Sequence, residues 1–153
     1  MRGETSVHRA YLGLGSNLGD RRQNIEKAVT LIGERVGVVL CQSSLIETEP
    51  WGFDSENTFL NGVILVETAL TPRQLMKTTQ KIERDMGRKV KSLPSNHSPL
   101  TSKIYADRPI DIDILLYDDL TIDEPDLKIP HPLMHERDFV MIPLKEISSG
   151  LQD

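Results

Sequence analysis

Hydrophobic and polar residues alternate most strictly between residues 108 and 117. Ile110, Ile112 and Ile114 alternate there with Asp111 and Asp113. A period of two predicts a β-strand with one buried face, because successive side chains of a strand point to opposite faces. We therefore expect the isoleucines to enter the core together. The two aspartates should share the opposite face, with their Cα atoms ~6.5–7 Å apart.

Two segments have the apolar period of an amphipathic helix. The first begins near Asp20, a good N-cap residue, and ends between Gly33 and Gly37. The second begins at Thr71-Pro72 and ends at Gly87, which suits a left-handed C-terminal cap. The residues of the two apolar stripes are Ile25, Ala28, Val29 and Ile32, and then Leu75, Thr79, Ile82 and Met86.

Further apolar runs predict strands, because they are short and bounded by turn residues. They cover residues 10–15, 36–46, 59–67 and, in shorter pieces, 120–129, before a helical turn at 133–137 and a last apolar run at 139–144. The core order is then β-α-β-β-α-β with a C-terminal extension. This order predicts an α+β fold of the ferredoxin-like type, with an antiparallel sheet and its helices on one face.

Periodicity disappears between residues 88 and 107, where lysines are mixed with serines and prolines. A loop of this length in a compact domain is usually disordered or a functional lid. We expect residues 1–9 to be a flexible lead-in and residues 10–153 to be one domain. Residues 88–107 should be a lid that is mobile without ligand and orders over a bound nucleotide.

The composition narrows the classes of function. The chain has 153 residues, a formal net charge of −5 and one cysteine, Cys41. An acidic chain argues against a broad nucleic-acid-binding surface, which is normally basic. A lone cysteine forms no disulfide within the chain, the N-terminus has no apolar signal region, and no run approaches the ~20 residues of a membrane span. We expect a cytoplasmic protein with neither a nucleic-acid nor a membrane partner.

The acidic pair carries the clearest chemistry. Two neighbouring carboxylates repel each other, and a cation between them removes that cost. Mg²⁺ typically takes one or two carboxylates together with phosphate oxygens and water. Asp111 and Asp113 therefore suggest a Mg²⁺–nucleotide site on a rigid strand. The alternative is an ordinary solvated strand face, which is common for an isolated Asp-x-Asp motif.

A glycine motif follows the first predicted strand. Gly13-x-Gly15-x-x-x-Gly19 is one residue longer than the dinucleotide-binding pattern. Glycines that supply positive φ angles at a tight bend are the favoured interpretation.

Polar residues on and after the second helix also have ordinary explanations. Gln80, Glu83 and Arg84 would form its solvated face, and Arg88 would be a favourable cation at its end. His131, between two prolines, is either a buried and satisfied histidine or a phosphate contact. Aromatic residues in or beside loops more often receive flat ligands than aromatic residues elsewhere do. Those residues are Trp51, Tyr105 and Phe59.

Several motifs then occur in a fixed order over residues 10–144. They are residues 11–20 (Tyr-Leu-Gly-Leu-Gly-Ser-Asn-Leu-Gly-Asp), Thr48-x-Pro50-x-Gly52, Phe59-Leu-Asn61, Ile82-Glu83 with Gly87-Arg88, Arg108-x-Ile-Asp-Ile-Asp-Ile114, Pro130-His131-Pro132 and Arg137-x-Phe139. Together they resemble the hydroxymethyldihydropterin pyrophosphokinase family of folate biosynthesis. The resemblance implies transfer of a diphosphate from ATP to the hydroxymethyl group of 6-hydroxymethyl-7,8-dihydropterin, with release of AMP.

The resemblance also implies roles for individual residues. Asp111 and Asp113 would hold two Mg²⁺ ions that bridge the triphosphate, and would be catalytic together with Arg88 and Arg108. The residues that would contact ATP are Gln80, Arg88, Arg108, Ile114, His131 and Arg137, with the arginines on the phosphates. Phe59 and Phe139 would sandwich the pterin, whose amide edge Asn61 would pair. Thr48, Pro50, Trp51 and Tyr105 would complete the pterin site. We expect the protein to act as a monomer.

The chain departs from the family pattern in the lid. Ile104 and Val90 stand where the family usually has arginines, and Lys103 or Lys91 could supply part of that charge. Two other functions remain open on the residues alone. One is a two-metal nucleotidyl transferase, which would release pyrophosphate in place of AMP. The other is a ligand-binding or RNA-binding sheet without turnover, which the acidic strand face disfavours.

Overall fold

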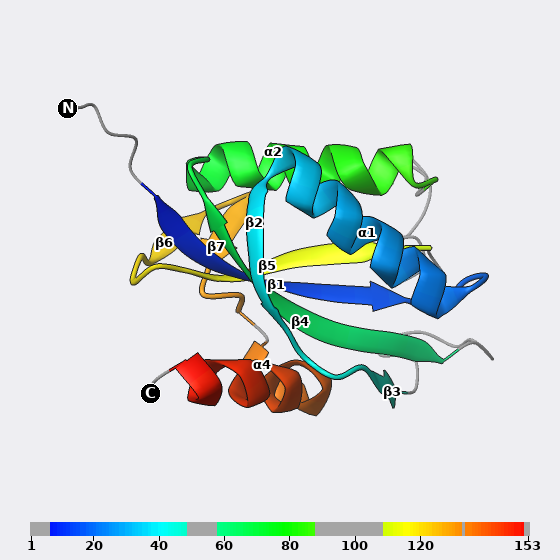
Figure 1. Cartoon of the computed structure of the whole chain (residues 1–153). Helices are drawn as coiled ribbons and strands as arrows, with labels where there is room; N and C mark the ends of the chain where they lie inside the picture. The colour runs from blue at the N-terminus through cyan, green and yellow to red at the C-terminus, as the bar shows by residue number, and fades with distance from the viewer. Residues whose placement is uncertain (1–6, 49–57, 88–108, 133, 152–153) are drawn as a thin grey trace.

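The computed structural model describes residues 7–48, 58–87, 109–132 and 134–151. In chain order, its elements are β1 (His8–Ser16), α1 (Arg21–Arg35), β2 (Gly37–Gln42), β3 (Ile46–Thr48), β4 (Phe59–Thr68), α2 (Pro72–Asp85), β5 (Asp111–Tyr117), β6 (Ile122–Glu124), β7 (Leu127–Ile129), the 3₁₀ turn η1 (Met134–Glu136) and α4 (Asp138–Leu151) (Figure 1). Among the helices in these ranges, none has both the length and the apolar character needed to cross a membrane.

The main sheet is antiparallel, with the strand order β2-β4-β1-β5 and with β3 paired to β4. β6 and β7 form a separate hairpin. The predicted α+β fold with an antiparallel sheet is therefore confirmed. β5 pairs with β1 along one edge only, so its other edge has no strand partner among the described residues.

The starts of both predicted helices are confirmed. The Asp20 carboxylate accepts a hydrogen bond from the Gln23 N–H, which caps α1. Thr71 and Gln74 form a reciprocal capping box at the start of α2, and Pro72 occupies its first turn. Each cap satisfies backbone N–H groups that have no partner inside the helix.

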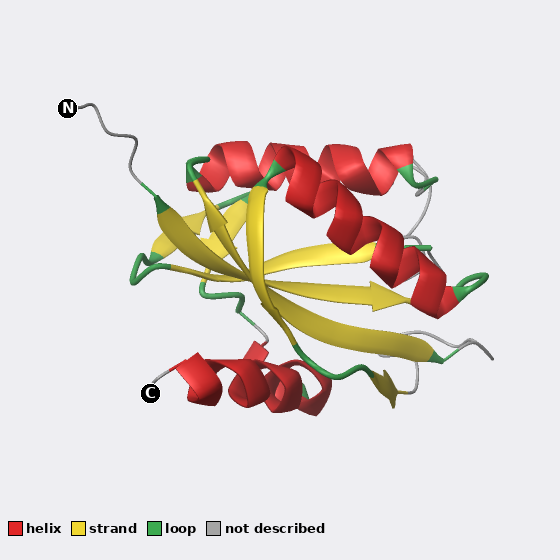
Figure 2. Ribbon diagram, in the orientation of Figure 1, coloured by secondary structure: helices red, strands yellow, loops and turns green. Residues whose placement is uncertain are grey.

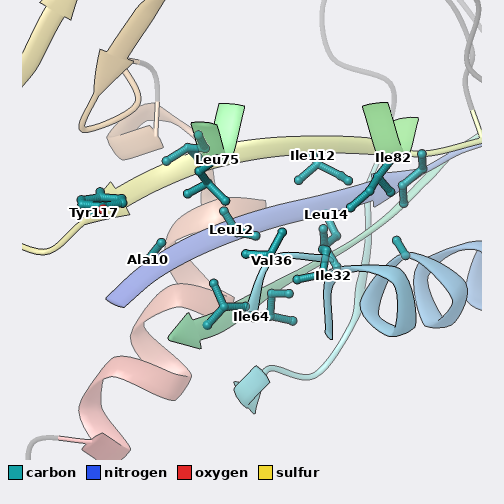
Figure 3. Packing of buried hydrophobic residues seen from close by; sticks show 14 of the residues in the cluster. Ala10, Leu12, Leu14, Ile32, Val36, Ile64, Leu75, Ile82, Ile112 and Tyr117 are labelled. Atoms are coloured by element: carbon teal, nitrogen blue, oxygen red, sulfur yellow. The ribbon is translucent and has the colours of Figure 1, made fainter. Parts of the chain in front are cut away.

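The larger core lies between the sheet and the pair α1 and α2. Leu12, Leu14, Ile112 and Ile114 point to this side from β1 and β5 (Figure 3). The alternation predicted for β5 is thus confirmed. Packing of this face leaves Asp111, Asp113 and Leu115 on the opposite face. The pairing of β5 with β1 shifts register after Ile114, and Tyr117 at the end of the strand returns to the larger core.

A second core contradicts the prediction that helices cover one face only. α4 packs on the opposite side of the sheet from α1 and α2 (Figure 2). The residues that form this second core are Val63, Leu65, Leu115, Met134, Val140, Leu144 and Ile147. The reason is that β4 has apolar residues on both faces, and its second face needs a cover. The predicted C-terminal extension is this helix.

Two strand boundaries also differ from the prediction. β1 begins at His8, inside the predicted lead-in 1–9, because the Arg9 N–H donates to the Asp118 carboxylate at 2.8 Å and the Asp118 N–H donates to the Arg9 carbonyl at 2.8 Å. The strand predicted over residues 36–46 is divided between β2 and β3. Ser44 lies in the break and donates its N–H and O–H to Glu146 of α4.

Candidate active site

The two aspartates of β5 lie on the side of the sheet away from α1 and α2. Across the pairing of β5 with β1, Gly15 lies opposite Asp111 and Gly13 lies opposite Asp113. The glycines add no side chains of their own to this part of the sheet. The strand next to the carboxylates is therefore bare apart from the neighbouring side chains of Leu115 near Gly13 and of Asn61 and Phe59 near Gly15. The prediction assigned these glycines to a tight bend with positive φ. That is correct for Gly19, with φ of 72°, and wrong for Gly13 and Gly15, which belong to β1.

β4 brings two predicted pterin-binding residues to the same bare surface. Asn61 lies opposite Gly15 on the other side of β1. A Cβ at Gly15 would lie 3.0 Å from the Asn61 Oδ1 and 3.5 Å from the Phe59 Cδ1, so the close approach favours glycine, and a larger residue would displace Asn61 by a few tenths of an ångström. Asp111, Gly15 and Asn61 thus form a row across three adjacent strands. Two strand spacings separate the Asp111 and Asn61 Cα atoms by ~10 Å.

The Asn61 amide is oriented by β3. Its Nδ2 donates to the Thr48 Oγ1 at 2.8 Å, which directs Oδ1 toward Gly15. A neighbouring network holds the β3–β4 pair in place, since the Arg21 guanidinium donates to the Glu47 carboxylate at 2.9 Å and to the Thr58 carbonyl at 3.1 Å. Thr48 therefore contributes its side chain to the orientation of Asn61.

A cavity of about 390 Å³ opens at the unpaired edge of β5, between α2 and the β6–β7 hairpin. Five residues predicted to serve the nucleotide or its metal line it, namely Gln80, Asp111, Asp113, Ile114 and His131. Its other lining residues include Met76, Pro125, Leu127 and Lys128. The family resemblance assigned these five residues to ATP and its metal ions, and the fold brings all five to the lining of one cavity.

Glu83 contradicts its assignment to the solvated face of α2. It is 8% exposed, and its carboxylate accepts the Ile112 N–H at 2.7 Å. The reason is that α2 lies against the open edge of β5, where a backbone donor needs an acceptor. The apolar period of the α2 sequence did not predict the contact between Glu83 and Ile112. That period identifies the side of the helix that packs on a sheet face, and α2 also packs against the edge of β5.

His131 lies beside the acidic pair. Its backbone N–H donates to the Leu115 carbonyl at 3.0 Å, which fixes the segment after the cis Ile129–Pro130 bond to β5. Burial lowers the pKa of its imidazole, the positive charge of Arg137 lowers it further, and Asp111 opposes both. The neutral imidazole is therefore the favoured form near neutral pH.

Arg137 and Phe139 join this group from the start of α4. The Arg137 guanidinium carbon lies 5.6 Å from the centre of the Phe139 ring, within the range of a cation–π contact. Phe139 is partly buried against the second core, so it lies on the same side of the sheet as the bare glycines. The predicted residues Pro50, Trp51, Arg88, Tyr105 and Arg108, and the predicted lid 88–107, lie outside the described residues.

The acidic pair suits Mg²⁺ that also binds phosphate. Within the described ranges, no group of three or more His, Cys, Asp or Glu side chains could hold a metal ion. Two carboxylates beside a bare strand and an open cavity match a cation that takes its other ligands from phosphate and water. The residues present therefore fit a metal that arrives with a nucleotide.

Comparison with known proteins agrees with this geometry. The model of the 7,8-dihydro-6-hydroxymethylpterin-pyrophosphokinase family matches residues 11–149. A 2-amino-4-hydroxy-6-hydroxymethyldihydropteridine pyrophosphokinase of Porphyromonas gingivalis is 44% identical over 142 residues, 92% of this chain and 91% of that protein. Proteins with the same name from Aquifex aeolicus and Bacillus subtilis are 40% and 38% identical, over 92% and 94% of this chain and 81% and 80% of theirs.

Solved structures agree on the fold. A crystal structure of an HPPK-DHPS in complex with substrates has a TM-score of 0.70 at 16% identity and covers 93% of this chain. Wild-type Plasmodium falciparum HPPK-DHPS with pteroate has a TM-score of 0.66 at 17% identity and covers 95% of this chain. This chain spans only 40% and 39% of those two chains. With the family match over nearly the whole length, the chain belongs to the 7,8-dihydro-6-hydroxymethylpterin-pyrophosphokinase family.

Proposed function

We propose that this protein transfers a diphosphate from ATP to the hydroxymethyl group of 6-hydroxymethyl-7,8-dihydropterin and releases AMP, as a step of folate biosynthesis. The observation that carries the proposal is the row of Asp111, Gly15 and Asn61. Its acidic end suits a metal-bound phosphate chain, and its amide end suits the edge of a pterin. Both ends lie on one face, ~10 Å apart, which is a suitable span for two substrates that react with each other.

We assign ATP to the cavity at the edge of β5. Gln80 and Ile114 would lie beside the nucleoside, and the neutral His131 would hydrogen bond to a phosphate oxygen. Asp111 and Asp113 would hold two Mg²⁺ ions. These ions would neutralise phosphate charge and help to align the triphosphate of ATP for in-line displacement. Arg137, and Arg88 and Arg108 by their motif positions, would bind phosphate oxygens.

We assign the pterin to the surface over Gly15. Phe59 and Phe139 come from distant parts of the chain, and both lie on this face of the sheet. Stacking between them would hold any flat heterocycle, at ~0.5–1.5 kcal/mol per aromatic pair beyond area burial. Asn61 would select the pterin, since its amide has one donor group and one acceptor atom and Thr48 holds this side chain in place. Trp51, Pro50 and Tyr105 complete the proposed pterin site.

The transfer itself needs positioning more than covalent chemistry. The pterin hydroxyl would attack the β-phosphorus atom of ATP, the bond to the α-phosphate oxygen would break, and AMP would leave. The chain's own contribution would be to hold the two substrates on one rigid sheet and to exclude water, with residues 88–107 as the proposed lid. No covalent intermediate with the protein is part of this proposal.

We further infer that the strand order β2-β4-β1-β5 is the ferredoxin-like arrangement. We also propose that the protein works as a monomer. A reducing cytoplasm is the proposed location, since the single cysteine allows no intrachain disulfide.

Product analysis tests the proposal. The protein would be incubated with Mg²⁺, 6-hydroxymethyl-7,8-dihydropterin and ATP, and the products would be separated. We expect AMP and the pterin diphosphate in equal amounts. Free pyrophosphate with a nucleotidylated acceptor would indicate a nucleotidyl transferase, and binding without turnover would indicate a ligand-binding module. Either result would overturn the proposal.

A further inference from the structure

β5 carries its two aspartates at an edge of the main sheet, where, among the described residues, the strand has a partner on one side only. The backbone groups of a strand point alternately to its two neighbours, so an edge strand leaves half of them without a strand partner. Ile112 lies between Asp111 and Asp113, and its N–H points to this open side. The acceptor it finds there is the Glu83 carboxylate of α2.

This contact is buried and short. Glu83 is 8% exposed, Ile112 is 7% exposed, and the N–H to Oε2 distance is 2.7 Å. A helix has no lateral backbone acceptor of its own, so only a side chain of sufficient reach can serve a strand edge from α2. Burial of a carboxylate is costly unless hydrogen bonds compensate for it, so the pairing has to be specific.

We propose that Glu83 is a positioning residue for the acidic pair. Its carboxylate takes the place of the missing neighbouring strand and fixes the pleat of β5 at Ile112. The side chains of Asp111 and Asp113 then keep a constant separation and direction toward the metal-bound phosphates. This inference rests on the proposed function, and it adds a residue that acts through the strand and not on a substrate.

The competing explanation is direct contact, because Glu83 also lines the cavity. The two explanations differ in whether the negative charge of Glu83 is needed. An amide oxygen can still accept the Ile112 N–H, although more weakly than a carboxylate oxygen, whereas a ligand contact that needs negative charge would not survive an amide. Glu83→Gln should therefore behave like wild type if Glu83 acts through the strand, and Glu83→Ala should not.

Hydrogen exchange of the Ile112 amide, measured on the ligand-free protein, gives a readout independent of turnover. In Glu83→Ala the amide should exchange roughly tenfold to a hundredfold faster, since a buried donor loses its acceptor. In Glu83→Gln it should exchange within about threefold of wild type. Glu34→Ala, which removes an exposed glutamate of α1, is the matched control and should change nothing.

Binding of a non-hydrolysable ATP analogue with Mg²⁺ is then measured on the same variants by calorimetry. We expect Glu83→Ala to weaken the metal-dependent binding by about tenfold or more, and Glu83→Gln to bind within about threefold of wild type. Should Glu83→Ala fail to fold, Glu83→Gln alone decides, because weak binding with normal Ile112 protection assigns Glu83 to the ligand and overturns the proposal.

Two further results would overturn it. One is unchanged exchange of Ile112 in a folded Glu83→Ala variant, and the other is fast exchange with normal binding and turnover, which leaves Glu83 a purely structural role. Failure of the proposed function looks different. In that case wild type itself forms no AMP, while the exchange of Ile112 still responds to the loss of Glu83.

Discussion

The two faces of the main sheet are built from the same strands and have opposite characters. The face toward α1 and α2 is mostly apolar, with Leu12, Leu14 and Ile64 beside the isoleucines of β5. The other face is divided. α4 packs over one part, and the remainder carries Asp111, Asn61 and the bare Gly15. Alternation along a strand therefore lets one segment stabilise the fold and carry the site at once.

The extent of α4 marks where the second core ends and the candidate site begins. Val63 and Leu65 of β4 are buried under α4, and Asn61, on the same face of the same strand, is near the site. Phe139 lies at the boundary, partly buried against this core and close to Arg137. α4 thus borders the candidate site on the same face of the sheet and does not cover Asn61 and Asp111 with its core.

The largest expected effect separates the two faces directly. Asp111→Ala and Asp113→Ala should each lower turnover by orders of magnitude and leave the unfolding temperature nearly unchanged, because neither side chain belongs to either core. Ile112→Ala, between them on the other face, should lower the free energy of unfolding by ~2–5 kcal/mol. Steady-state kinetics and thermal unfolding measure the two effects.

Two results would contradict this contrast between the functional face and the core face of β5. A folded double variant of Asp111 and Asp113 with normal turnover would show that the acidic face has no role in the reaction. A loss of several kcal/mol of stability in Asp111→Ala would show that this face is structural after all.

The next effect concerns the bare strand. Gly15→Ala places a methyl group 3.0 Å from the Asn61 Oδ1 and should weaken pterin binding roughly tenfold or more. Gly13→Ala is the matched control, since its methyl group meets only Leu115, at an ordinary 3.5 Å. Calorimetry with the pterin compares them, and equal affinity in both variants would remove Gly15 from the site.

A third prediction concerns selection of the pterin. Asn61→Ala should weaken pterin binding and discrimination between heterocycles, because an unpaired amide edge costs ~1–3 kcal/mol, and ATP binding should be nearly unchanged. Phe139→Ala should weaken pterin binding with less loss of discrimination, since stacking is tolerant of ring identity. If Asn61→Ala loses ATP affinity equally, its assigned role is wrong.

The smallest effect concerns the β3–β4 pair at the margin of the site, which polar contacts hold more than packing. Hydrogen bonds from Thr58 and then Arg21 lower the pKa of Glu47 below 4.5. The folded pKa is below the unfolded one, so this stabilisation is present above pH 4.5 and is lost as the pH falls through the folded pKa. Glu47→Gln should lower the melting temperature slightly at pH 7, and the difference from wild type should shrink as the pH falls below 4.5. A constant difference over this range would contradict the assignment.

Local patterns allowed the fold to be predicted where a local cause dominates. The caps at Asp20 and Thr71 and the alternation around Ile112 are properties of neighbouring residues, and all three are confirmed. α4 was not recognised as a helix because Pro143 lies within it, and an internal proline normally ends a helix. The four apolar residues 63–66 in β4 were the available signal, since a strand buried on both faces needs a second cover.

The site divides in the same way. The alternation of residues 110–114 was enough to predict that Asp111 and Asp113 share the face opposite the isoleucines. The family resemblance was needed to predict that Gln80, Ile114 and His131 belong to one site. The buried Glu83 and the role of Gly15 did not, because each depends on which element packs beside it in three dimensions.

The central claim is that ATP binds in the cavity at the edge of β5 and the pterin binds on the adjoining face of the sheet, over Gly15. Backbone amide chemical shifts of the isotope-labelled protein test it most directly, by titration first with an ATP analogue and Mg²⁺ and then with the pterin. The account predicts that the nucleotide shifts the amides of Gln80, Asp111–Ile114 and His131, and that the pterin shifts those of Gly15, Phe59 and Asn61. Shifts confined to α1, or to the exposed edge of β2, would contradict it.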